Sequence, residues 1–175
     1  MLATLFYRGT LSLLGTTAFC LTINQQSVHA QRSASLFSMC QFTGAGYDYA
    51  QDVTIGRELF TSVRAIWAYG GSAICRIRPG DSAYKYKTLR LAFGIQDQNA
   101  DNYNCRRPMT VNVYLDGNLE ESTSLLPSEK SLLLLNVSRT STVTVDVPEI
   151  GGCWGVVHFT QAILEPISTS SGRRY

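Results

Sequence analysis

The chain lacks the residue patterns of several common functional classes. Basic and acidic side chains nearly balance, with 15 Lys plus Arg against 13 Asp plus Glu and a formal net charge of +2. A protein that binds a nucleic acid backbone needs a basic stripe, so this composition argues against nucleic acid as a partner. No two cysteines form a C-x-x-C pair, which argues against a structural zinc site.

Catalytic motifs are also missing. His158 is the only histidine apart from His29, and it follows Val156 and Val157 in an alternating apolar run without a nucleophile elbow nearby. No pair of carboxylates stands out for glycoside hydrolysis, although any two loop acids could meet in the fold. We therefore predict a protein that is not an enzyme, with no catalytic residue and with His158 as a hydrogen-bonded strand residue.

The chain has no apolar run long enough to span a bilayer, but its first thirty residues resemble an export signal. Arg8 is their only Lys, Arg, Asp or Glu side chain, Leu11–Ile23 forms a short apolar core, and Val28–Ala30 places small residues where a signal peptidase acts. A lipoprotein anchored through Cys20 is the alternative, but Phe19 stands where a small residue is needed. We predict cleavage after Ala30, a secreted or periplasmic protein, and no membrane span after cleavage.

The mature chain has the pattern of an all-β protein. Residues 89–95 and 111–115 alternate apolar and polar, so each run can bury one face against a second sheet. Further strands, each bounded by turn residues, are expected at 36–42, 53–60 (a strand or a hairpin bent at Gly56), 63–68, 73–77, 122–126, 132–137, 143–147 and 156–164.

This pattern predicts an antiparallel β-sandwich of jelly-roll type without long helices. The expected organisation is a signal peptide over residues 1–30, one sandwich domain over 31–166, and a disordered tail over 167–175, which is rich in Ser, Thr and Arg.

The segments VTIGRELF, SAICRI, YKYKTLRLAFGIQDQ, TVNVYLDG and CWGVVHF occur in an order that resembles the NPCBM-type carbohydrate-binding modules. The most specific parts are T-I-G from Thr54, G-I-x-D over Gly94–Asp97, and V-Y-x-D-G over Val113–Gly117. The resemblance covers about Leu36–Pro166 and implies a β-sandwich that binds carbohydrate.

The chain departs from that family pattern at several positions. Arg57 replaces a second glycine, residues 63–68 lack a His-Ala segment, and the last strand follows Gly152-Cys153-Trp154 rather than an Asp-containing segment. A shared sandwich does not transfer its sugar specificity, so the resemblance supports the fold better than the ligand.

If the strands alternate in direction, four connections emerge at one end of the sandwich: 67–72, 97–107, 127–131 and 149–154. A sugar has an apolar C–H face and a rim of hydroxyls, so its site needs a flat ring and planar polar groups. The expected ligand-binding residues at this end are Trp67, Tyr69, Tyr103 and Trp154, with the polar Asp97, Asn99, Asp101, Asn102 and Arg106. The competing interpretation places the two tryptophans in core packing, because aromatic residues dominate β cores.

Four cysteines remain after the predicted cleavage, and an even number in an exported domain indicates two disulfides with three possible pairings. Cys105 and Cys153 both fall in connections assigned to the same end. We expect them to form one bridge and Cys40 and Cys75 to form the other.

The polar connection begins with D-x-N-x-D-N from Asp97, which resembles the opening of a calcium loop. Pro108 stands where the closing glutamate would fall, and Asn102 replaces the central glycine. Asp and Asn are favoured in solvated turns for their own backbone hydrogen bonding, so calcium is possible but no metal or other cofactor is expected.

Two functions fit these observations. The first is an exported, non-catalytic domain that recognises a cell-surface or extracellular glycan or polysaccharide. The second is a structural or protein-interaction domain of the cell envelope that has lost its sugar site, with an envelope protein as its partner.

Overall fold

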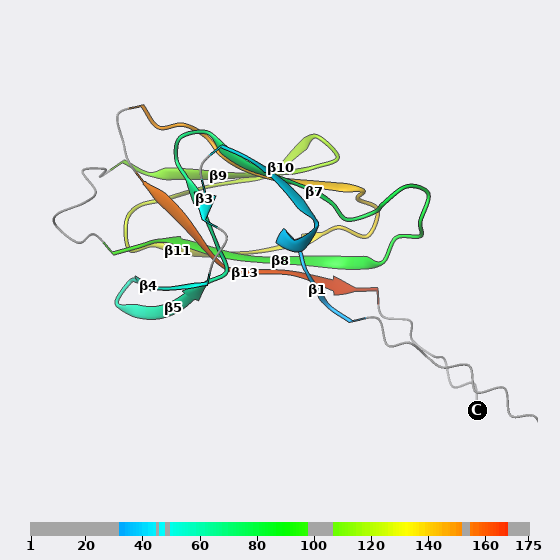
Figure 1. Ribbon diagram of the computed structural model, residues 1–175, viewed down its shortest axis with the longest axis horizontal. Coiled ribbons are helices and arrows are strands. Elements are labelled where there is room, and N and C mark those ends of the chain that lie inside the picture. The colour runs from blue at the N-terminus through cyan, green and yellow to red at the C-terminus, as the bar shows by residue number, and fades with distance from the viewer. Residues whose placement is uncertain (1–31, 45, 48–49, 98–106, 152–154, 168–175) are drawn as a thin grey trace, which may run out of the picture.

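The computed structural model is a sandwich of two antiparallel sheets that face each other (Figure 1). It describes residues 32–44, 46–47, 50–97, 107–151 and 155–167. The predicted fold class is therefore confirmed. The expected signal peptide and nearly all of the expected tail lie outside the described residues. Within the described part, no helix is long and apolar enough to cross a membrane.

The first sheet has the order β11-β8-β13-β6-β3, with β1 paired to β13. Its strands are β1 (Ala34–Ser35), β3 (Gly46–Tyr47), β6 (Arg64–Trp67), β8 (Tyr86–Ile95), β11 (Lys130–Asn136) and β13 (Val156–Pro166). The second sheet has the order β10-β9-β12-β7-β2. Its strands are β2 (Cys40–Thr43), β7 (Gly71–Arg76), β9 (Met109–Leu115), β10 (Asn118–Leu125) and β12 (Thr142–Val147).

The core lies between the two sheets and follows the alternation seen in the sequence. Leu89, Leu91 and Phe93 on β8 are at most 1% exposed, and Val111 and Val113 on β9 are fully buried. Because successive strand residues point to opposite faces, the intervening polar residues lie on the outer faces. The two alternating runs at 89–95 and 111–115 thus supply facing layers of the core.

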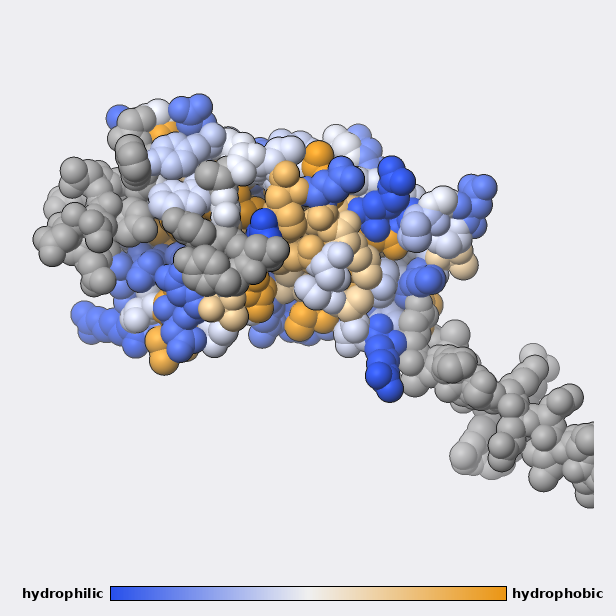
Figure 2. Space-filling model, in the orientation of Figure 1, coloured by the Kyte–Doolittle hydropathy of each residue, from blue (hydrophilic) through white to orange (hydrophobic). Residues whose placement is uncertain are grey.

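The expected first strand over 36–42 is wrong in its first half. Phe37–Met39 form a 3-10 turn, η1, and only Cys40–Thr43 continue as β2. Leu36 and Phe37 are both buried, and an extended strand cannot place adjacent side chains on one side. Figure 2 shows hydrophobic side chains in the middle of the face turned toward the viewer, over η1 and the start of β2. Phe42 of β2 packs against the core.

The segment predicted as a strand or a hairpin forms a hairpin, with β4 (Gln51–Ile55) paired to β5 (Glu58–Ser62). Its turn residues Gly56 and Arg57 have φ angles of 60° and 68°, as a tight two-residue hairpin turn requires. Ile55 packs on Gly94 of β8, where an added Cβ would lie 2.9 Å from Ile55 Cγ2. The hairpin therefore lies against the outer face of the first sheet, below β11 and β13 in Figure 1.

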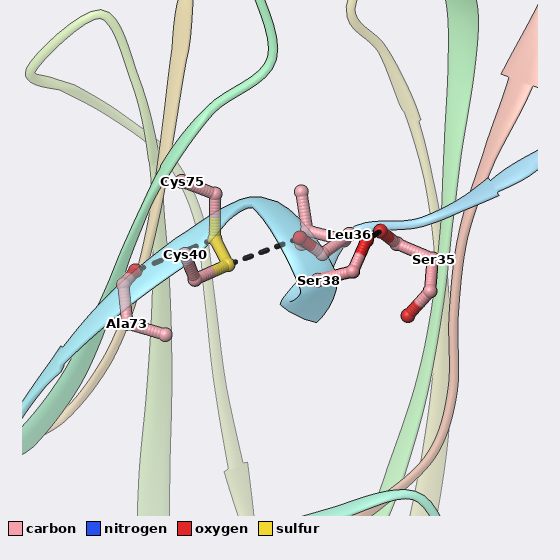
Figure 3. Close-up of a disulfide and its surroundings, with 6 residues drawn as sticks. All are labelled: Ser35, Leu36, Ser38, Cys40, Ala73 and Cys75. Carbon is pink, nitrogen blue, oxygen red and sulfur yellow. Dashed lines mark hydrogen bonds between the residues drawn. A yellow bond between two sulfur atoms is a disulfide. The ribbon is translucent and has the colours of Figure 1, made fainter.

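A disulfide joins Cys40 of β2 to Cys75 of β7 (Figure 3). The two residues are direct cross-strand partners, so the bridge links the edge strand of the second sheet to its neighbour. This pairing is as predicted. The second expected bridge, between Cys105 and Cys153, lies outside the described residues and stays a prediction.

Candidate functional site

The residues that flank the four connections 67–72, 97–107, 127–131 and 149–154 all lie at the same end of the sandwich. We call this end the loop end. In the first sheet, Val157 of β13 pairs with Ile95 of β8, and Val156 pairs with Trp67 of β6. The end of β8, the end of β6 and the start of β13 therefore coincide. β11 starts at the same place, since its first residue Lys130 pairs with Gly94 next to Ile95.

The second sheet closes the loop end from the other side. Val147, the last residue of β12, pairs with Gly71, the first residue of β7. Leu125, the last residue of β10, pairs with Met109, the first residue of β9. The predicted common end is thus confirmed for the described residues that flank the connections.

Hydrogen bonds join three of these connections to one another. Ala68 N–H donates to the Gly155 carbonyl oxygen (2.9 Å), and Ile150 N–H donates to the Ala68 carbonyl oxygen (3.2 Å). Arg107 Nη1 donates to the Gly151 carbonyl oxygen (3.4 Å). The chain on both sides of residues 152–154 is therefore bonded to Ala68, the residue that follows Trp67.

Trp67 and Tyr69 form an aromatic pair at the loop end. Their ring centroids are 5.8 Å apart and their planes are inclined by 19°, which is a stacked arrangement. Ala68 between them is buried, whereas Tyr69 is 39% exposed and Trp67 is partly exposed. Alternation along the chain thus turns Ala68 into the core and leaves two parallel rings at the surface.

The Asp97 carboxylate has a structural role that the sequence analysis missed. Its Oδ1 accepts a hydrogen bond from Gly56 N–H (2.7 Å), and its Oδ2 accepts one from Arg57 N–H (3.0 Å). Its own N–H donates to the Thr54 carbonyl oxygen (2.8 Å). The T-I-G and G-I-x-D segments therefore contact each other, and Asp97 closes the β4–β5 turn. A ligand role for this residue stays a prediction.

Local hydrogen bonds favour the ionised form of Asp97. Partial burial acts to raise the pKa of Asp97, but a hydrogen bond with the Ser128 side chain acts against it. Backbone hydrogen bonds from Arg57 and Gly56, together with the Arg57 charge, also favour the carboxylate, so the pKa is lowered. The negative charge stabilises a turn whose two residues are both left-handed.

The other predicted site residues lie outside the described residues: Asn99, Asp101, Asn102, Tyr103, Arg106 and Trp154. Their roles stay predictions, as does the calcium motif, of which only Asp97 is described. Among the described residues, no group of three or more His, Cys, Asp or Glu side chains could hold a metal ion.

His158 is a buried strand residue, as expected. Ser62 Oγ donates to the Arg64 carbonyl oxygen (2.9 Å), and His158 Nδ1 forms a hydrogen bond with Ser62 Oγ (3.3 Å). Burial lowers the pKa of His158 to about 4, so the ring is neutral at pH 7. The neutral His158 ring, which is hydrogen-bonded to the Ser62 hydroxyl, therefore has a structural role.

Comparison with known proteins points to a shared architecture. No protein-family model matches the chain, and no curated protein matches it. Among solved structures, the CBM51-2 and INT domains of Clostridium perfringens ZmpB match with a TM-score of 0.61 and 16% identity. That match covers 77% of this chain and 32% of the other, so the chain spans about a third of its length.

Two further matches are modules of the same type. The CBM51 of Clostridium perfringens GH95, in complex with methyl-galactose, has a TM-score of 0.57 and 12% identity, over 76% of this chain and 99% of that one. The tandem CBM51 modules of Sp3GH98 from Streptococcus pneumoniae SP3-BS71 have a TM-score of 0.54 and 10% identity, over 76% and 47%. The chain therefore has the β-sandwich fold of carbohydrate-binding modules. At these identities the likeness establishes the fold alone.

Proposed function

We propose that this chain is an exported, non-catalytic carbohydrate-binding domain whose ligand site is the loop end. The stacked pair of Trp67 and Tyr69 carries this proposal, because it presents aromatic surface where four connections converge. The C–H face of a pyranose ring packs on such a surface, as other amphipathic groups do. The polar residues predicted in the 97–107 connection would then bond its hydroxyls.

Galactosides and N-acetylglucosamine are the first ligands to test. The CBM51 of Clostridium perfringens GH95 was solved with methyl-galactose, and CBM51-2 of ZmpB was solved with GlcNAc. Export is supported by the predicted signal peptide and by the Cys40–Cys75 bridge, since disulfides persist in oxidising compartments.

The decisive experiment is a glycan array on the purified protein, followed by calorimetric titration of each sugar that binds. Trp67→Ala and Tyr69→Ala should each weaken binding about tenfold or more, because each removes stacking surface. Tyr84→Ala is the matched control, since Tyr84 is also 39% exposed but lies between β7 and β8, at the opposite end. It should leave the affinity unchanged.

Two outcomes would contradict the proposal. The first is an array without signal for a folded protein, and the second is binding that neither loop-end variant alters. A folded protein that binds no glycan but captures an envelope protein in stoichiometric amounts would favour the alternative, a domain that has lost its sugar site.

A further inference from the structure

We propose a second saccharide-binding site, a groove on the outer face of the first sheet beside the β4–β5 hairpin. The groove has a volume of about 520 Å³ and is formed by the hairpin and by β8, β11 and β13. Small-molecule sites have volumes of roughly 300–1,000 Å³, so a ligand of one or more sugar rings fits. None of the residues expected to bind glycan at the loop end lines this groove.

The groove exists because the hairpin covers only part of the sheet. Ile55 lies directly on Gly94, and the next outward residue of β8 is the small Ala92. The longer side chain of Arg90 follows beyond Ala92 on β8, and Leu132 of β11 lies beside Ala92 as its cross-strand partner. A low floor at Ala92 therefore lies between the hairpin and a higher part of the sheet.

The walls combine apolar and hydroxyl-bonding groups. Phe60 of the hairpin and Leu132 of β11 supply apolar surface, and Leu132 is 52% exposed. Thr61 and Gln161 supply a hydroxyl and a carboxamide beside them. This combination of a ring, an aliphatic side chain and neutral polar groups matches the two surfaces of a sugar.

The charges around the groove are neutralised in pairs, which argues for a neutral ligand. Arg90 Nε lies 3.2 Å from Glu165 Oε1, and Lys130 Nζ lies 2.7 Å from Glu58 Oε2. Lys130 Nζ also lies 5.0 Å from the centroid of the Phe60 ring, which helps to hold that ring in place. An anionic ligand would have to compete with both carboxylates, whereas a neutral oligosaccharide would not.

The test uses NMR titration of the purified protein with three neutral probes, cellohexaose, xylohexaose and β-1,4-galactohexaose, and with a heparin hexasaccharide. At least one neutral probe should shift the methyl signals of Ala92 and Leu132. Leu132→Ala should weaken that binding about fivefold to tenfold by removing apolar contact. Leu134→Ala is the matched control, because Leu134 is 57% exposed on the same face of β11 but does not line the groove.

The proposal is overturned if no neutral probe shifts the groove signals, if only the heparin hexasaccharide does, or if Leu134→Ala weakens binding as much as Leu132→Ala. Tyr69→Ala separates this site from the loop end, since it should leave the groove shifts unchanged. If it abolishes them, the groove is not an independent site. If the groove binds while Trp67→Ala and Tyr69→Ala have no effect anywhere, the loop-end proposal fails and the groove stands.

Discussion

At the scale of single residues, Asp97 connects two segments that are 41 positions apart in sequence. Its carboxylate holds Gly56 and Arg57 in a turn where both residues have positive φ. A left-handed conformation is unfavourable for arginine, so this turn needs a compensating interaction. Arg57 stands where the family resemblance led us to expect a glycine, and Asp97 helps to stabilise the turn in spite of it.

Asp97→Asn should lower the free energy of unfolding by about 1–2 kcal/mol. An amide offers one acceptor oxygen instead of two and turns its NH₂ group toward a backbone N–H. Urea denaturation followed by tryptophan fluorescence measures the change. Asp81→Asn, in an exposed turn, is the control and should alter stability by less than about 0.5 kcal/mol. Equal midpoints for Asp97→Asn and the unmodified protein would refute the structural role.

At the scale of elements, the edge of the second sheet depends on a covalent link. β2 is short, pairs with β7 alone among the described strands, and follows η1 rather than a longer strand. The Cys40–Cys75 bridge closes a segment with a sequence separation of 35. Such a link restricts the unfolded chain and so favours the folded state.

Replacing both cysteines, as Cys40→Ala with Cys75→Ala, should reduce the free energy of unfolding by about 2–4 kcal/mol. Thermal and urea unfolding measure this loss. The neighbouring cross-strand pair provides the control, because Gln41 and Ile74 are exposed partners on the same two strands. Changing both to alanine should cost less than about 1 kcal/mol. A similar loss in the two double variants would show that strand contacts, and not the bridge, stabilise this edge.

At the scale of the whole molecule, the buried His158 couples stability to pH. A small domain unfolds cooperatively, so a proton taken up by one buried group on unfolding affects the stability of the entire sandwich. The pKa of His158 is about 4 in the folded state, against 6.5 for an exposed ring. Between these values the unfolded chain binds more protons at this position, so acid favours unfolding.

The free energy of unfolding should therefore be insensitive to His158 above about pH 6.5 and should fall from pH 6.5 toward pH 4. The contribution of this residue is at most about 3 kcal/mol over that range. Urea midpoints measured across the range, compared with those of His158→Gln, isolate the effect, since the carboxylates are common to both proteins. The variant should show a smaller slope. Parallel profiles would mean that the pKa of His158 is the same in the folded and the unfolded state.

Whether a feature of this structure could be predicted from sequence depends on whether it arises from neighbouring residues or from contacts between distant segments. The alternation at 89–95 and 111–115 predicted buried faces correctly, and antiparallel alternation predicted the shared loop end. Cys40 and Cys75 were the pair left once Cys105 and Cys153 had been assigned to the loop end, and their bridge is confirmed. The structural role of Asp97 was not predicted. An acidic residue at the start of a polar loop has the same local sequence pattern whether it binds a ligand or accepts hydrogen bonds from a distant turn.

The sequence by itself determined the class of fold and which residues of the long strands face the core, since a period of two along the chain depends only on local backbone geometry. Tertiary structure alone decided that Leu36 and Phe37 turn inward together, and that Ile55 sits on Gly94. It also decided that the hairpin leaves a groove over Ala92. Each of these features depends on whether a distant segment has room to pack, and that room exists only once the two sheets have come together.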